Sequence, residues 1–122
     1  MKSLILFLSL LMSSFSYAQS ISGEVSFKGS NPKGVLYIFA KKFDGKMPIP
    51  LAVKRISNPK FPIKFELSHK DAMMKQIPFE GPFVVTARLS PSGDVSDKSG
   101  LEISTVKKVI IGQKDIKLIL SK

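Results

Sequence analysis

The chain has 122 residues, of which 19 are lysine or arginine and nine are aspartate or glutamate, so its formal net charge is +10 at pH 7. It contains no cysteine, which excludes disulfides, thiolate catalysis, a blue-copper centre and a lipid anchor on cysteine. A basic balance of this size is typical of proteins that meet nucleic acid, an anionic membrane or an acidic partner. The lysines are dispersed along the chain, which favours a solvated basic surface.

The first 18 residues are typical of a cleaved signal peptide. Lys2 precedes an apolar run that is too short to span a bilayer, and small residues at Ser16 and Ala18 stand where signal peptidase recognises them. The alternative is a retained membrane anchor or a buried helix, but a β-pattern starts directly after Ala18. We therefore expect a periplasmic chain with one domain over residues 19–122. Nucleic acid is then not an expected partner, and membrane contact is at most peripheral.

Alternation of apolar and polar residues predicts seven strands. In Ser20–Lys28, Ile21, Gly23, Val25 and Phe27 share one face. Val35–Lys42 is apolar on both faces, as central strands are, and we expect Phe39 to anchor the core there. Asp44-Gly45 then turns the chain back into a hairpin partner at 51–56. The remaining predicted strands cover residues 61–67, 83–89, 104–111 and 115–120.

Between the strands lie polar turns and one short helical turn. Ser68 is a favourable cap for a helical turn over residues 69–75, which Pro78 ends. The loop 90–100 is polar and contains glycine. Seven short strands with at most one helical turn predict an all-β chain, a single β-sandwich of immunoglobulin-like or cupredoxin-like type.

The residues give little support to catalysis. Gly-x-Ser-x-Gly, phosphate loops and zinc spacings do not occur, and no acid lies in an apolar stretch that would raise its pKa. His69 is the one histidine, and on a helical turn it would share a face with Met73, an arrangement that suits Cu(I). The plainer interpretation is a solvated His69 beside a methionine that fills the end of the sandwich. We therefore expect neither an enzyme nor a cofactor.

Three segments in a fixed order carry a resemblance to a known family. They read FAKKFDGKMPIPLAVKR, FPIKFELSHKDAMM and FVVTARLSPSGD, and a Gly23-Glu24-Val25 opening precedes them. Together they resemble the C-terminal domain of the cytochrome c-type biogenesis protein H family (CycH/CcmI type). The matching positions are Phe39, Ala40, Gly45, Met47, Pro48, Pro50, Leu51, Ala52, Val53 and Arg55, then Pro62, Leu67, Asp71, Ala72 and Met73, then Ala87, Arg88, Leu89, Ser90, Ser92 and Gly93.

The resemblance covers most of residues 19–122 and departs from the family pattern in one segment. An acid usual after the third segment is missing at Ser99-Gly100-Leu101. Larger members also carry membrane helices and a tetratricopeptide-repeat region, which this sequence does not contain. The resemblance implies an immunoglobulin-like periplasmic module, a chaperone-like accessory of cytochrome c maturation. Its implied partners are the C-terminal helix of apocytochrome c and the haem-ligation machinery.

A methionine–proline surface is the candidate site for such a partner. Methionine adapts to varied apolar surfaces, and proline fixes a loop without further ordering on binding. A groove of this kind suits the apolar face of an amphipathic helix, with arginines meeting carboxylates on its flank. The candidate partner-binding residues are Met47, Pro48, Ile49, Pro50, Arg55, Met73, Met74 and Arg88.

Two other functions stay open from the sequence. One is an envelope-associated structural β-sandwich whose basic surface binds anionic polymer or lipid. The other, which has less support, is a copper-handling protein built on His69 and Met73.

If the leader is cleaved after Ala18, the exported protein begins at Gln19. Intact mass spectrometry of material isolated from the periplasm then gives the mass of residues 19–122. A mass that includes Met1 would contradict the prediction.

Overall fold

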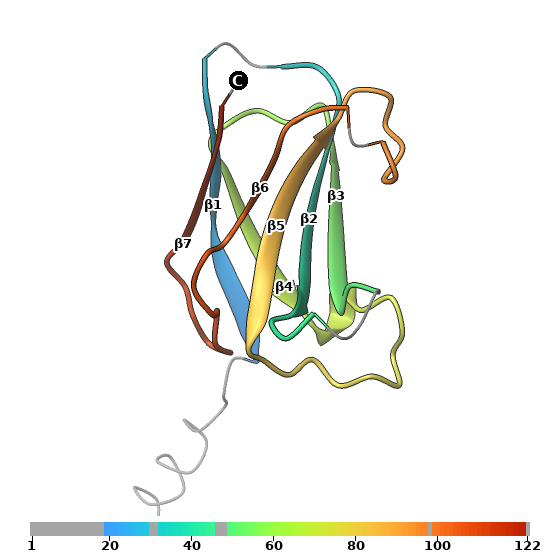
Figure 1. Ribbon diagram of the computed structural model, residues 1–122, viewed down its shortest axis with the longest axis vertical. Helices are drawn as coiled ribbons and strands as arrows, with labels where there is room; N and C mark the ends of the chain where they lie inside the picture. The colour runs from blue at the N-terminus through green and yellow to red at the C-terminus, as the bar shows by residue number, and fades with distance from the viewer. Residues whose placement is uncertain (1–18, 30–31, 46–48, 98, 122) are drawn as a thin grey trace, which may run out of the picture.

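The computed structural model of the protein describes residues 19–29, 32–45, 49–97 and 99–121. Its seven strands form two sheets that face each other, as the sequence predicts for a β-sandwich (Figure 1). The elements are β1 (Ser20–Lys28), β2 (Val35–Lys42), β3 (Ala52–Ser57), β4 (Ile63–Ser68), a 3-10 turn (His69–Asp71), β5 (Phe83–Ser90), β6 (Glu102–Ser104) and β7 (Ile116–Ser121).

The smaller sheet has the order β4-β1-β7, with β1 in the centre. β1 runs antiparallel to β4 but parallel to β7, so the first and last strands of the domain are neighbours. Gly23 makes this pairing close, because a Cβ atom there would lie 2.0 Å from the backbone oxygen of Ile116. The larger sheet has the order β3-β2-β5-β6, and all of its pairs are antiparallel.

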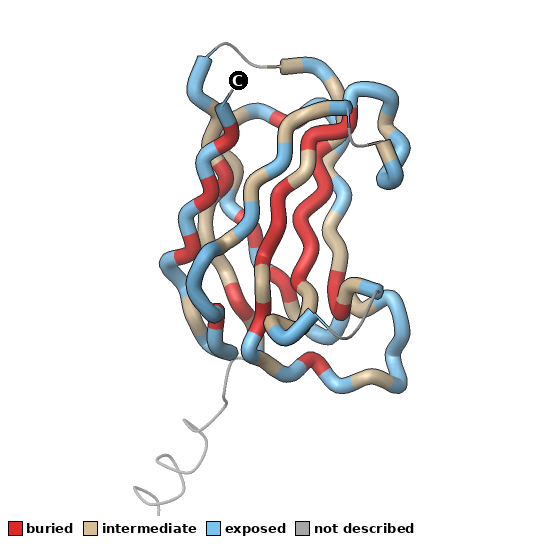
Figure 2. The backbone as a smooth tube through the Cα atoms, in the orientation of Figure 1, coloured by how far each residue is buried: buried red, intermediate tan, exposed pale blue. Residues whose placement is uncertain are grey.

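The hydrophobic core lies between the two sheets (Figure 2). Alternate residues of β1, β4 and β7 point inward as their sequence alternation predicts, among them Ile21, Phe65 and Leu118. From the larger sheet, the inward residues include Phe83, which is fully buried and stacks on Phe79 with 4.6 Å between ring centroids. Burial of this continuous apolar layer is what holds the two sheets together.

β2 is buried on both faces, and this corrects the role predicted for Phe39. Leu36, Ile38 and Ala40 belong to the core between the sheets. Tyr37 and Phe39 alternate with them and therefore lie on the outer face of the larger sheet. Phe39 is only 3% exposed, but it is covered by other groups on that face and does not anchor the inter-sheet core.

Two predicted elements are shorter than expected. The strand predicted over 104–111 is wrong in position, because β6 covers Glu102–Ser104 and shares only Ser104 with it, and Val109 forms only an isolated bridge with Phe83. The helical turn predicted over 69–75 ends at Asp71, whose carboxylate accepts a hydrogen bond from the Ser68 backbone N–H. In both segments local propensity is outweighed by backbone pairing with neighbouring strands, since Ala72 bridges to Ala52 immediately after the turn.

Truncation of Phe83 should be far more damaging than truncation of an outward lysine. Phe83→Ala removes a fully buried ring, so we expect it to lower the free energy of unfolding by about 3–5 kcal/mol. Lys64→Ala, on the exposed face of β4, should stay within about 0.5 kcal/mol of the wild type. Urea unfolding followed by circular dichroism measures both, and equal costs would contradict the assignment of inward and outward faces.

Candidate partner-binding groove

A groove runs across the outer face of the larger sheet. Its volume is about 570 Å³, and its residues come from β2, β3, β5 and three connections. The lining residues are Tyr37, Phe39, Lys41, Pro50, Val53, Arg55, Met73, Arg88, Val95 and Ser96. Most of the lining is aromatic, aliphatic or thioether surface, with three cationic side chains, which is the composition of a site for an apolar partner with acidic flanks.

The floor of the groove follows from the two-sided character of β2. Phe39 lies opposite Val53 of β3, and Tyr37 lies opposite Arg55. The Lys41 ammonium and the Arg88 guanidinium lie 5.3 Å and 5.1 Å from the centre of the Phe39 ring, within cation–π range. These two cations cover the ring, which explains why an aromatic residue on an outer face is buried.

One wall of the groove is the connection after β5. The Tyr37 hydroxyl donates a hydrogen bond of 2.6 Å to the Gly93 backbone oxygen. This bond links β2, which forms the floor, to the connection that forms the wall. Arg88 Nε forms an ion pair with the Glu102 carboxylate, and its Nη1 donates to the Val95 backbone oxygen at 2.9 Å. Arg88 therefore ties Val95, a groove residue, to β6.

Two aspartates stabilise this wall from within. The Ser99 and Ser92 hydroxyls donate to the Asp97 carboxylate at 2.6 Å and 2.7 Å, and these bonds hold the pKa of Asp97 well below its usual value of 3.8. The Ser96 backbone N–H and hydroxyl likewise lower the pKa of Asp94. Hydrogen bonds to the ionised form are the cause in both cases, and both carboxylates are ionised at neutral pH.

The opposite wall comes from the connections that flank β3. Pro50 lies two residues before the start of β3, and the bridge between Ala52 and Ala72 fixes the segment that carries Met73 beside it. Met73 is 58% exposed although it is a large apolar residue, so it is available to a partner. Lys54 Nζ lies 3.9 Å from Asp71, a long ion pair that lies next to this wall.

The structure brings together four of the eight residues predicted from the sequence: Pro50, Arg55, Met73 and Arg88 line the groove. Ile49 and Met74 are exposed but are not part of its lining. Met47 and Pro48 lie outside the described residues. Whether any of these residues binds a partner stays a prediction.

The sequence prediction missed the floor and one wall of the groove. Tyr37 and Phe39 were expected within the strand but not at the site, and Lys41, Val53, Val95 and Ser96 were not singled out. One signal was available, because a strand that is apolar on both faces in a two-layer domain must present aromatic residues on an outer surface. The wall at Val95 gave no such signal.

His69 lies away from the groove. Its Nε2 is 2.9 Å from the Lys75 backbone oxygen, and it lines a separate hollow with Gln19, Phe79 and Ile111. Because the helical turn ends at Asp71, His69 and Met73 do not share a helical face. In the part of the chain that the structure describes, no three acidic or histidine side chains gather as a metal site would require.

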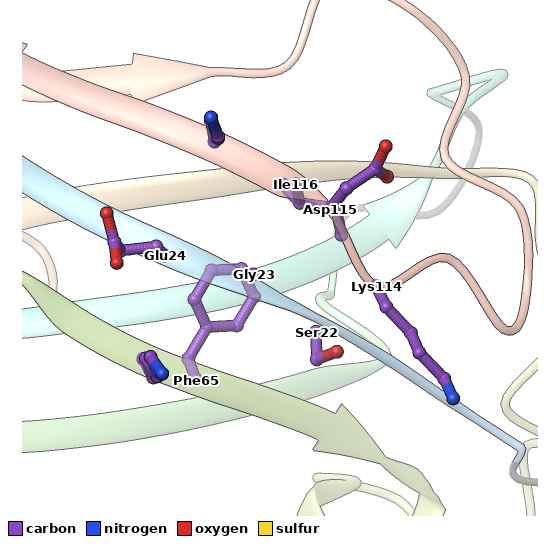
Figure 3. A pocket seen from close by; sticks show the side chains of 9 residues that line it. Ser22, Gly23, Glu24, Phe65, Lys114, Asp115 and Ile116 are labelled. Carbon is purple, nitrogen blue, oxygen red and sulfur yellow. The ribbon is translucent and has the colours of Figure 1, made fainter.

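Another hollow, of about 440 Å³, lies over Gly23 and Ile116 on the smaller sheet (Figure 3). The Glu24, Lys114 and Asp115 side chains at its margin point in different directions and do not converge on a common point. The mixed, divergent charges of this hollow make it a weaker candidate than the aromatic groove.

The fold and the groove thus define a β-sandwich with an apolar, cation-flanked binding surface. Residues 18–120 match the model of the cytochrome c-type biogenesis protein H Ig-like domain, and the chain belongs to this family. Family membership supports a role in cytochrome c maturation and an envelope location. Among the described residues, no helix is long and apolar enough to cross a membrane.

Two further similarities accompany the family match. An uncharacterized protein of Aquifex aeolicus (strain VF5) is 28% identical over 90 residues, which are 74% of this chain and 59% of that protein. This chain therefore spans well under two thirds of that relative's length. A solved structure of an alternative pilotin from the type II secretion system of Vibrio cholerae has a TM-score of 0.56 and 21% identity, and the match covers 84% of this chain and 95% of the pilotin. That likeness shows the fold alone.

The aspartates of the groove wall predict how stability depends on pH. Because the folded pKa of Asp97 is lowered, its stabilising contribution is complete above 3.8 and is lost as the pH falls below that value. Asp97→Asn should therefore destabilise the chain at pH 6, and the difference from the wild type should shrink steadily below pH 4. Urea unfolding between pH 6 and pH 2.5 measures this difference, with Asp115→Asn as the control. A difference that does not change with pH would contradict the assigned hydrogen bonds.

Proposed function

We propose that this chain is a non-catalytic, periplasmic binding module that holds the C-terminal helix of apocytochrome c during haem ligation. It would act as a chaperone-like accessory beside the haem-ligation machinery. The observation that carries the proposal is the groove, in which an exposed methionine and a proline face an aromatic floor beside cationic side chains. The family match supports the pathway, and the groove supports the mode of binding.

An amphipathic helix is the occupant that suits this surface. Tyr37, Phe39 and Val53 form an apolar floor on rigid, paired strands, so little conformational freedom is lost there on binding. Met73 supplies an adaptable wall for an apolar ridge whose sequence differs between partners. A helix laid in by its apolar face buries the exposed Met73 side chain and keeps its own polar face in water.

We also infer that the chain reaches the periplasm by cleavage after Ala18. The support is the lysine, apolar run and small residues of the leader, together with the envelope location that the family favours. Residues 1–18 lie outside the described part of the chain.

A second function rests on another surface. Between β6 and β7, Val106 and Ile110 are exposed and stand beside Lys107 and Lys108. Apolar side chains interleaved with lysines favour peripheral contact with anionic lipid, as an envelope-associated structural domain would make. The separation of His69 from Met73 gives no comparable support to a copper site.

A peptide with the sequence of a cytochrome c C-terminal helix should bind the exported chain weakly. Met73→Asp places a carboxylate on the groove wall, and we expect it to weaken binding roughly tenfold or more without unfolding the domain. Isothermal titration calorimetry at low and high salt measures the affinity, and circular dichroism checks the fold.

Ile119→Asp is the matched control, because Ile119 is 55% exposed on the smaller sheet and lies outside the groove. It should leave peptide affinity unchanged. Binding that survives Met73→Asp would place the site elsewhere. Binding that disappears entirely at high salt would reduce it to non-specific charge attraction.

A further inference from the structure

The three cations that line the groove differ in what they already contact. The Arg88 side chain is 13% exposed, and its guanidinium forms an ion pair with Glu102 and donates to the Val95 backbone oxygen. Its charge is therefore compensated within the fold by a carboxylate. Arg88 is a positioning residue that shapes the floor and one wall.

Lys41 and Arg55 have no such compensation. Among the described residues, neither cation lies within ion-pair distance of a carboxylate, since the two ion pairs found there are Lys54–Asp71 and Arg88–Glu102. Arg55 is exposed, and it donates only to neutral oxygens, Nη1 to the Ser57 hydroxyl at 2.8 Å and Nε to the Tyr37 hydroxyl at 3.4 Å. The groove thus carries two positive charges that no carboxylate of the described residues compensates.

The strand register sets the distance between these charges. Arg55 lies opposite Tyr37, and Lys41 is four residues further along β2 from Tyr37. At a rise of about 3.3 Å per residue, the Cα atoms of Lys41 and Arg55 are separated by roughly 13 Å along the strand direction, while the Lys41 ammonium itself lies 5.3 Å from the centre of the Phe39 ring. Phe39 and Val53, a cross-strand pair, lie between them. The groove therefore presents the order cation, apolar floor, cation.

We propose that the groove selects a helix that carries two acidic residues seven positions apart, with an apolar residue between them on the same face. Positions i and i+7 of a helix share a face and are separated by about 10.5 Å, a span that the flexible Lys41 and Arg55 side chains close. Acids at i and i+3 are only about 4.5 Å apart and reach one cation at a time. This inference rests on the proposed function, because it takes the occupant to be helical.

Synthetic helices of about 14 residues, held helical by one hydrocarbon staple on the solvent face, test the spacing directly. Three peptides share one composition of apolar residues and differ in their acids, with glutamates at i and i+7, glutamates at i and i+3, or glutamines at i and i+7. Calorimetry against the exported chain should show the i,i+7 peptide binding roughly fivefold tighter than the i,i+3 peptide, as one added ion pair allows, and more than fivefold tighter than the glutamine peptide, which forms no ion pair.

Charge-removing variants identify the cations that are responsible. Arg55→Gln and Lys41→Gln should each abolish the advantage of the i,i+7 peptide over the i,i+3 peptide, because only one of the two cations then remains. Lys64→Gln, on the exposed face of the smaller sheet, should leave the advantage intact. Circular dichroism confirms that each variant is folded.

The outcomes separate this inference from the proposed function. Equal affinities for the i,i+7 and i,i+3 peptides, with binding still lost in Met73→Asp, would overturn the spacing rule and leave the helix-binding groove standing. An advantage that persists in both Arg55→Gln and Lys41→Gln would also overturn it. No binding by any of the three peptides or by the cytochrome c helix would overturn both.

Discussion

The central position of β2 is the constraint on which the rest of the molecule depends. One set of its alternate side chains, Leu36, Ile38 and Ala40, lies in the core between the sheets. The other set, Tyr37 and Phe39, lies on the outer face and forms the floor of the groove. Fold and candidate site therefore share one strand, and a change of one residue in its register would exchange the two sets. A site on a strand paired on both sides is held more rigidly than a site on a loop.

Arg88 connects this floor to the groove wall. Its guanidinium lies over Phe39 of β2, forms an ion pair with Glu102 of β6 and donates to Val95 in the connection after β5. Arg88 therefore links three strands and this connection in one network. The Tyr37 hydroxyl bond to Gly93 fixes the same connection from the floor. The aspartates of the wall accept hydrogen bonds from serine hydroxyls and backbone N–H groups. These bonds hold the wall in place in the free domain, which lowers the conformational entropy lost on binding.

The sequence was sufficient for the fold class and for the faces of most strands. Ser20–Lys28 and Ile63–Ser68 each bury one face, so their alternation determines which residues point inward. β2 is apolar on both faces, so periodicity could not decide which set lies between the sheets, and Phe39 was assigned to the wrong one. The parallel pairing of β1 with β7 is a long-range contact with no local sequence signal. The position of β6 at Glu102–Ser104, before the predicted segment, depends on pairing with β5 that residue propensities do not encode.

For the candidate site, the sequence indicated which types of residue would line it but not which residues lie close together in the fold. Pro50, Met73, Arg55 and Arg88 come from four different segments, and no spacing along the chain indicates that they meet. The family resemblance placed these residues in segments that match the family pattern, but it did not distinguish the roles of Arg55 and Arg88. That separation required the contacts of each guanidinium, because Arg88 is largely buried against Glu102 whereas Arg55 is exposed.

An apolar groove on an outer face lowers the solubility of a free domain. The cations of the groove reduce this effect because they cover its apolar floor. Lys41 and Arg88 cover the Phe39 ring, which is only 3% exposed although no second sheet covers it. A lysine held over an aromatic ring at an exposed site contributes only about 0.5–1 kcal/mol, so a partner can displace the Lys41 side chain at small cost. Once displaced, the Lys41 ammonium stands at the groove margin, where a carboxylate of the partner can pair with it. In the proposed mode of binding, the side chain that shields the floor in the free domain would thus become a contact in the complex.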